Sequence, residues 1–314
     1  MTLVLVLVVL ALAVPWGAAP VARRLAAVLP PREACWTLTA AALLLAGGTI
    51  AVLIGLFHVP FLASLEQVPI RRVLDVWPAA VPVAVAAGSV MLAQVVLVLR
   101  RWFRHRSVLE RAWRLAARGT GDGDLLVLPG DDVDAFALPG HRGRTGRIMV
   151  TVGMLRALGP GEREVLLAHE RAHLSGRHHL FSAVVDLSTA VHPALSSLRA
   201  SLQFHLERWA DEAAATAVGD RRLAAAAIAR AALVGSRRRE AGGGYPLLSV
   251  TSGPVPRRVE ALLLPEPVGP RGGTHRAGAL GLAATVAVSA PAALALAYGL
   301  HEYVEYAAVA VRGG

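Results

Sequence analysis

The sequence predicts a mainly α-helical membrane protein with four transmembrane helices and one α+β domain that contains a small β-sheet. Of its 314 residues, 55% are hydrophobic and only 17% are charged, which excludes a disordered chain and is unusual for a soluble enzyme. The apolar residues gather in four runs without Asp, Glu or Arg, and each run has about the 20 residues that a bilayer requires. One polar segment, residues 100–276, is long enough to fold as a separate domain.

The four apolar runs span residues 2–22, 34–57, 76–99 and 277–300. The first three make up an expected membrane unit of residues 1–99, and the fourth follows the polar domain. The first run could instead be a signal peptide. However, no basic residue precedes it and Arg23 and Arg24 follow it, which favours an uncleaved helix. Residues 301–314 are expected to form a short extracytoplasmic tail.

The basic residues indicate how the spans are oriented. There are 32 of them, all Arg, against 22 acidic residues. Residues 100–118 hold seven Arg and one Glu, whereas the loop between the second and third runs holds two residues of each sign. The positive-inside rule therefore predicts a cell-membrane protein with both termini outside and a cytoplasmic polar domain. Nucleic-acid binding could also explain the Arg cluster, but no recognition motif accompanies it, so we expect the lipid bilayer as the partner and no direct nucleic-acid contact.

The polar domain, residues 100–276, shows a few short β-favouring runs followed by helical patterns. The single cysteine, Cys35, excludes a disulfide framework and any metal site made of several cysteines. Turn residues separate the elements, and residues 236–256 form a loop rich in Gly, Arg and Pro. We expect a basic amphipathic helix over 101–118, strands over 125–128, 135–138 and 148–152, and helices over 160–175, 201–218, 221–235 and 257–264.

The sequence His-Glu-Arg-Ala-His, residues 169–173, points to metal chemistry. On a helix, positions i and i+4 share a face, so His169 and His173 can direct two imidazoles at one metal ion. Glu170 projects one residue further on, near enough to reach a water on the metal rather than the metal itself. Pro160 before the motif and an acidic first turn favour a helix at this point.

A catalytic zinc needs a third protein ligand and an open fourth position. Glu207, on a predicted downstream helix, is the best candidate, although it could be an ordinary surface carboxylate. Asp211 follows one turn later on the same face. Its carboxylate could accept the N–H of a ligating histidine and fix the tautomer of that ring, or it could be a solvated side chain.

Five short segments carry a resemblance to a known family. The chain resembles the integral-membrane metallopeptidases of the beta-lactam sensor-transducer (antirepressor) type and, more distantly, the heat-shock membrane protease and CAAX prenyl protease group. The resemblance covers about residues 120–265. It rests on residues 135–140, 148–151, 167–174 with Arg177 and His178 after them, 207–211 and 256–262.

The resemblance implies a zinc endopeptidase of the gluzincin type, with one zinc ion held by His169, His173 and Glu207 and with Glu170 as the catalytic residue. The expected substrate is a protein, for instance a cytoplasmic transcriptional repressor or another regulator. A quality-control protease for membrane proteins and a non-catalytic signalling protein with a structural zinc site are the alternatives. An intact Glu170 argues against the last, because a closed structural site has no use for a base. The family's large extracellular sensor domain is not expected, since residues 301–314 are too few to form one.

The apolar stretch of residues 180–202 lies between the predicted ligands. His173 and Glu207 must meet at one ion, so this stretch cannot cross the membrane once. It either packs against the membrane and the domain, which the cost of placing Asp186 in lipid favours, or forms a re-entrant hairpin that turns near His192 and Pro193.

The remaining histidines and two arginines are expected outside the metal site. His178 and His179 fall at a helix end, off the metal face, where they would cap carbonyls or meet lipid headgroups. His205 is expected to face away from Glu207, and His141 to be exposed in a turn. For Arg257 and Arg258, contact with a substrate carbonyl and a structural salt bridge are both open.

Overall fold

The computed structural model describes residues 2–65, 69–240, 254–265, 299 and 302 of the chain. Apart from two residues, the predicted fourth span and the predicted tail lie outside this part. The helices before the sheet are α1 (Thr2–Ala26), α2 (Pro31–Leu65), α3 (Ile70–Val76) and α4 (Ala80–Ala116). After the sheet come α5 (Val152–Ala157), α6 (Pro160–Ser175), α7 (His178–Val191), a 3-10 turn (Pro193–Ser196), α8 (Ser197–Val218), α9 (Arg221–Glu240) and α10 (Val255–Leu263).

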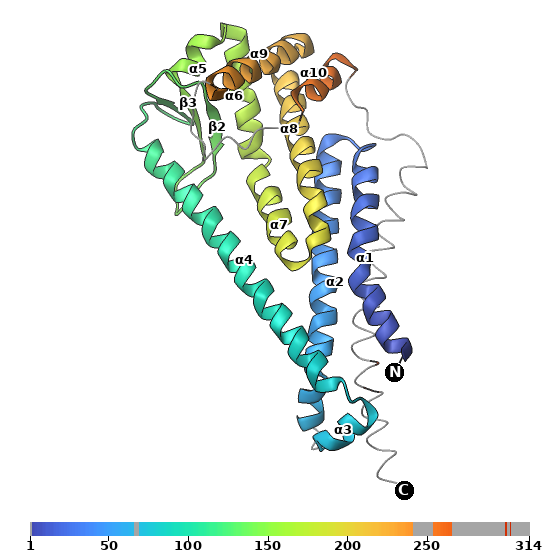
Figure 1. Ribbon diagram of the computed structural model, residues 1–314. Coiled ribbons are helices and arrows are strands. Elements are labelled where there is room, and N and C mark those ends of the chain that lie inside the picture. The colour runs from blue at the N-terminus through green and yellow to red at the C-terminus, as the bar shows by residue number, and fades with distance from the viewer. Residues whose placement is uncertain (1, 66–68, 241–253, 266–298, 300–301, 303–314) are drawn as a thin grey trace.

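Two helices of the described part are long and apolar enough to cross a membrane, namely Pro31–His58 of α2 and the helix α4. Figure 1 shows α1 and α2 side by side, while α4 slants away from them toward the sheet. The expected span over 76–99 and the expected basic helix over 101–118 are not two helices, because α4 is continuous from Ala80 to Ala116 and covers most of both ranges. The arginines that mark the end of the apolar run are good helix formers, so the charge pattern changes there but the backbone does not.

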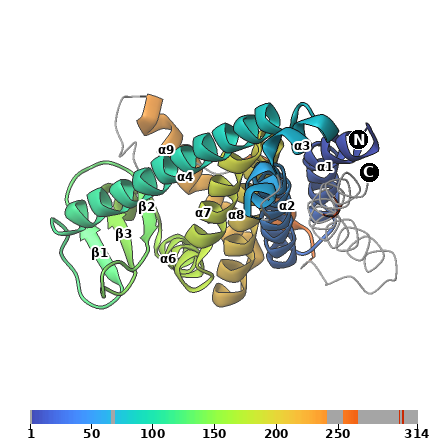
Figure 2. The same cartoon turned by 90° about the horizontal axis from the view of Figure 1, so that it is seen from below.

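The small sheet has three strands, β1 (Leu125–Leu128), β2 (Ala135–Leu138) and β3 (Arg147–Thr151), in the order β1-β3-β2. β1 runs parallel to the central strand and β2 antiparallel to it. The third strand ends one residue earlier than predicted, because the Thr151 side chain accepts the N–H of Met154 and caps α5. One face of the sheet packs on the end of α4, and β2 forms an edge beside α6 (Figures 1 and 2).

The junction of β3 and α5 depends on a glycine. A Cβ atom added at Gly153 would lie 2.3 Å from the carbonyl oxygen of Asp131 and 2.4 Å from that of Asp132. We expect Gly153→Ala to lower the free energy of unfolding by about 1–3 kcal/mol, since the backbone must shift to relieve the overlap. Chemical denaturation of the detergent-solubilised protein measures this change. Gly47→Ala, in open space on α2, is the control; equal stability of the two variants would contradict the packing argument.

Helices α7 and α8 form a hairpin that turns at His192 and Pro193, a geometry that fits both the packed and the re-entrant alternative for residues 180–202. The hairpin packs along α2 through a shared apolar core that includes Leu38, Phe181 and Leu198. At the turn, the His192 ring lies against α1, with its Nε2 3.1 Å from the carbonyl oxygen of Leu12. One candidate span is therefore packed directly on the helices that follow the His-Glu-Arg-Ala-His motif.

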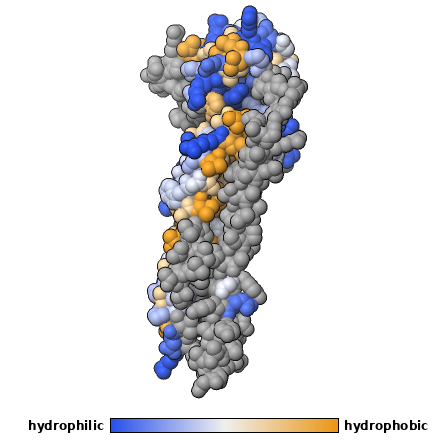
Figure 3. Space-filling view, turned by 90° about the vertical axis from the view of Figure 1, so that its right-hand side faces the viewer, coloured by the Kyte–Doolittle hydropathy of each residue, from blue (hydrophilic) through white to orange (hydrophobic). Residues whose placement is uncertain are grey.

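Helices α6, α8, α9 and α10 form the far end of the molecule. Their small and aliphatic side chains, among them Val165, Ala214 and Leu262, make a separate core. On the face shown in Figure 3, hydrophilic residues gather at this end of the molecule. The predicted helix over 160–175 is confirmed, whereas α8 begins four residues before the predicted 201 and α9 extends to Glu240.

Candidate metal centre

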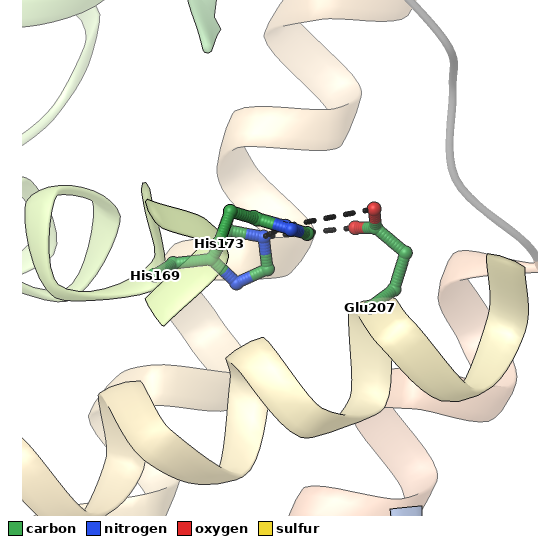
Figure 4. A group of neighbouring side chains, drawn as sticks. All are labelled: His169, His173 and Glu207. Atoms are coloured by element: carbon green, nitrogen blue, oxygen red, sulfur yellow. Dashed lines mark hydrogen bonds and ion pairs between the residues drawn. The ribbon is translucent and has the colours of Figure 1, made fainter. Parts of the chain in front are cut away.

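Helix α6 carries the two histidines of the motif. It begins after Gly159, whose N–H is accepted by the Glu162 side chain at 2.7 Å, and Pro160 occupies the first turn. His169 and His173 lie one turn apart on the side of α6 that packs on α8. Glu207 projects from α8 toward both imidazoles (Figure 4).

The three side chains converge on one small volume. The Nε2 atoms of His169 and His173 are 3.1 Å apart, and they lie 3.6 and 3.7 Å from the nearest Glu207 oxygens. All candidate ligand atoms lie within 4.8 Å of one another. A tetrahedral ion bonded at about 2.0–2.1 Å separates its ligand atoms by about 3.3 Å. The spacing and the N, N, O donor set therefore fit a metal ion such as zinc.

Behind His169, two charged residues complete the arrangement. The Nδ1 of His169 lies 3.0 Å from Asp211 Oδ1, on the side of the ring away from Glu207. Arg258, from α10, donates to both oxygens of Asp211 at 2.6 and 2.7 Å and lies 3.0 Å from Glu207 Oε2. Asp211 thus lies where the sequence placed it, and for Arg258 the structure shows the salt-bridge alternative. Arg257 points elsewhere, over the ring of Phe204.

His178 lies behind His173 and outside the group of candidate ligands, but the prediction that it caps carbonyls or meets lipid headgroups is wrong. Helix α6 ends at Ser175, and Arg177 adopts a left-handed conformation with φ of 51°, so α7 starts in a new direction at His178. The His178 ring is 3% exposed, and its Nδ1 lies 2.8 Å from the Nδ1 of His173. Gly176, three residues after His173, is the sequence signal of this helix end.

Of the other histidines, His205 makes no contact with the candidate ligands, and burial lowers its pKa to about 4. His141 is half-buried instead of exposed, with its Nε2 4.0 Å from a Glu110 oxygen. His179 is exposed, in keeping with its predicted place outside the metal site.

The three candidate ligands differ in charge. Burial disfavours protonation of His169, but Asp211 and Glu207 outweigh it and raise the pKa to about 10. Burial and the charge on His169 lower the pKa of His173 to about 3. Burial favours the neutral acid of Glu207, yet His169 holds the pKa of that carboxyl well below its usual range. Both imidazoles must be neutral to bind a metal ion, so metal binding at this centre would compete with protonation of His169.

Glu170 lines a cleft of about 800 Å³ that also contains the three candidate ligands. The edge strand β2 forms one wall through Ala135 and Ala137. Burial raises the pKa of Glu170 to about 7, against the attraction of His169 and a hydrogen bond with the backbone of Ala137. The carboxylate can therefore gain or lose a proton near neutral pH beside an extended strand edge.

A polar cluster of Arg101, His105, Asp186 and Arg199 borders the cleft, and all but Arg101 line it. The Asp186 carboxylate accepts from Arg199 and lies 2.9 Å from His105 Nε2, and Arg101 donates to the Asp186 carbonyl. These residues come from α4, α7 and α8, so the polar cluster connects one candidate span to the hairpin. The interactions with its cationic partners offset the free-energy cost of removing the Asp186 carboxylate from water.

This arrangement, with two histidines of one helix, a carboxylate of a second helix and a buried glutamate in a shared cleft, defines a class of metal-dependent hydrolase sites. Residues 104–245, less than half of the chain, match the family model described as Peptidase family M48, and this match indicates a metallopeptidase. The matched segment contains all three candidate metal ligands. No curated protein and no solved structure matches the chain.

Proposed function

We propose that the chain is a membrane-anchored zinc endopeptidase that hydrolyses peptide bonds of a protein substrate. The observation that carries the proposal is the convergence of His169, His173 and Glu207 within one coordination sphere, in the same cleft as Glu170. The match to Peptidase family M48 supports it independently. A zinc ion held there would polarise the scissile carbonyl and lower the pKa of a water molecule.

Several residues of the chain would serve this reaction directly. Glu170 would accept the proton of the attacking water and pass it to the leaving amine, which its raised pKa suits. The outer edge of β2, which pairs with no other described strand, would bind the substrate backbone in extended form by strand addition. Asp211 would hold the ring of His169 from behind, and Arg258 would keep Asp211 charged.

The proposed location is the cell membrane, with α2 and α4 as spans and the catalytic domain on the cytoplasmic side. The apolar side chains of α4 that are exposed, such as Val85, Leu92 and Val95, would contact lipid. The arginines that begin at Arg100 would then lie at the cytoplasmic surface.

The substrate is proposed to be a regulator, for instance a transcriptional repressor. The polar cluster beside the cleft belongs to helices that pack on or form candidate spans. This position favours substrates cut close to the bilayer, and it supports membrane-protein quality control as a second candidate function. Reconstitution into liposomes with a tethered and a soluble form of one substrate protein distinguishes the two, since quality control requires faster cleavage of the tethered form.

The central experiment is metal removal. The detergent-solubilised protein is expected to contain one zinc per chain by elemental mass spectrometry and to cleave casein. Treatment with the chelator 1,10-phenanthroline should abolish cleavage, because it removes the zinc ion that polarises the scissile carbonyl and the attacking water. Added zinc should restore cleavage. Cleavage that persists after zinc is shown to be gone would contradict the proposed function, as would the absence of zinc from folded protein.

A further inference from the structure

The two histidines of the candidate centre are arranged in the same way. Each directs its Nε2 at the common centre, where the two atoms are 3.1 Å apart, and each turns its Nδ1 outward. Behind His169 the outward nitrogen meets Asp211 at 3.0 Å. Behind His173 it meets the Nδ1 of His178 at 2.8 Å. His178 therefore occupies, for the second histidine, the place that Asp211 occupies for the first.

We propose that His178 is a positioning residue for His173, whose Nδ1–H it accepts on its own Nδ1, so that the Nε2 lone pair of His173 is presented to zinc. This inference rests on the proposed function, because it concerns the tautomer that a zinc ligand requires. It assigns His178 no contact with substrate or metal: its Nδ1 meets the outward nitrogen of His173, not the Nε2 that faces the centre.

The number of protons on a neutral imidazole determines the tautomers of His173 and His178. A neutral imidazole carries one N–H, and a nitrogen that binds a metal must offer a lone pair. If Nε2 of His173 binds zinc, its proton lies on Nδ1 and needs an acceptor. The neighbour within hydrogen-bonding distance is Nδ1 of His178, which accepts only if the His178 proton lies on Nε2. That Nε2 has no hydrogen-bond partner among the described residues, so the hydrogen bond to His173 is the one that orients the ring.

Local structure holds the His178 ring in this place. A Cβ atom at Gly176 would lie 2.5 Å from His178 Nε2, so the ring occupies space that only a glycine leaves open. On its other side, the ring of Trp209 lies 4.5 Å away, centroid to centroid. Trp209 in turn contacts Phe181 of α7 and lies beneath Arg32 of α2. The ring is thus enclosed between the end of α6 and an aromatic group that reaches the first candidate span.

Two substitutions separate the hydrogen bond from the packing. His178→Phe keeps a ring against Trp209 and Gly176 but removes the acceptor, whereas His178→Asn loses the ring and keeps an acceptor oxygen near the position of Nδ1. Zinc affinity, measured by competition with a chelating dye, is expected to fall about 10–100-fold in His178→Phe, as is usual when an outer partner of a ligand is lost. His178→Asn should stay within about threefold of wild type by the same reasoning.

The cobalt-substituted protein supplies a readout that packing alone does not move. Its visible absorption reports ligand geometry, and we expect it to change in His178→Phe and to return in His178→Asn. His205→Phe is the matched control, because it removes another buried histidine of the same region that does not contact a candidate ligand, and its zinc affinity should equal that of wild type. If His178→Phe does not fold, His178→Gln replaces it, since its longer side chain moves the acceptor away and should bind zinc more weakly than His178→Asn.

The outcomes distinguish this inference from the proposed function. Wild-type affinity in His178→Phe, or weaker binding by Asn than by Phe, would overturn the positioning role while leaving a zinc-loaded, active wild type intact. A wild-type protein that binds no zinc would overturn both. Weaker binding by Phe than by Asn, with an unchanged control, is the result that supports the inference.

Discussion

Replacing Glu170 with Gln is expected to lower the rate of peptide hydrolysis by about 10²–10⁴-fold, the usual contribution of a positioned general base. Gln has nearly the same shape but cannot accept a proton on its amide. Glu170 is buried in the cleft beside the candidate ligands but is not one of them, so zinc content should be unchanged. The loss would then lie in the chemical step and not in the metal site.

Casein hydrolysis and elemental analysis of the same preparation test this prediction together. Glu164→Gln is the matched control, since it changes an exposed carboxylate of the same helix and should retain wild-type activity. An active Glu170→Gln protein with full zinc would exclude Glu170 as the base. A variant that loses both zinc and activity would show instead that Glu170 supports the metal site.

The candidate ligands could be predicted from the sequence because helical periodicity decides them. His169 and His173 are four residues apart on a well-formed helix, and Asp211 follows Glu207 by the same interval on α8. Such local spacing survives folding unchanged. The packing of α6 on α8 brings the two pairs together. It was expected only because a catalytic zinc needs a third protein ligand from outside α6.

The outer residues of the site could not be predicted, because tertiary packing and turn geometry place them. Arg258 reaches Asp211 only after α10 docks on α8 and α9, and no short-range pattern encodes that docking. His178 reaches His173 only because the chain reverses direction at Arg177. In the fold, the bounds of β1 and β2 followed from the Gly, Pro and Asp residues around them, whereas β3 ends early at the cap that Thr151 makes. The continuous helix α4 did not follow either, since charge marks a membrane boundary without marking a helix end.

Replacing Arg258 with Met is expected to destabilise the metal-free protein by about 3–5 kcal/mol, the cost of removing one partner from a buried ion pair. The side chains of Arg258, Asp211 and Glu207 are 6%, 2% and 10% exposed, so water cannot replace the lost guanidinium. Burial opposes the charge on Arg258, but Asp211 and Glu207 raise its pKa. Met fills a similar volume, and the change therefore removes the charge and its hydrogen bonds with little loss of packing.

Denaturation with a chelator and denaturation with zinc distinguish the stabilisation that the Arg258 guanidinium provides from the stabilisation that a bound zinc ion provides. A bound zinc ion would neutralise Glu207 in place of the guanidinium, so the loss of stability in the variant relative to wild type should be smaller with zinc than without it. Stabilisation by mass action applies to both proteins. Arg257→Met changes the exposed neighbour on the same helix and should leave stability within about 0.5 kcal/mol of wild type. Because Asp211→Asn removes the charge that Arg258 compensates, the double variant should lose less than the two single losses combined. Strictly additive losses would show that Arg258 stabilises the fold through contacts other than this ion pair.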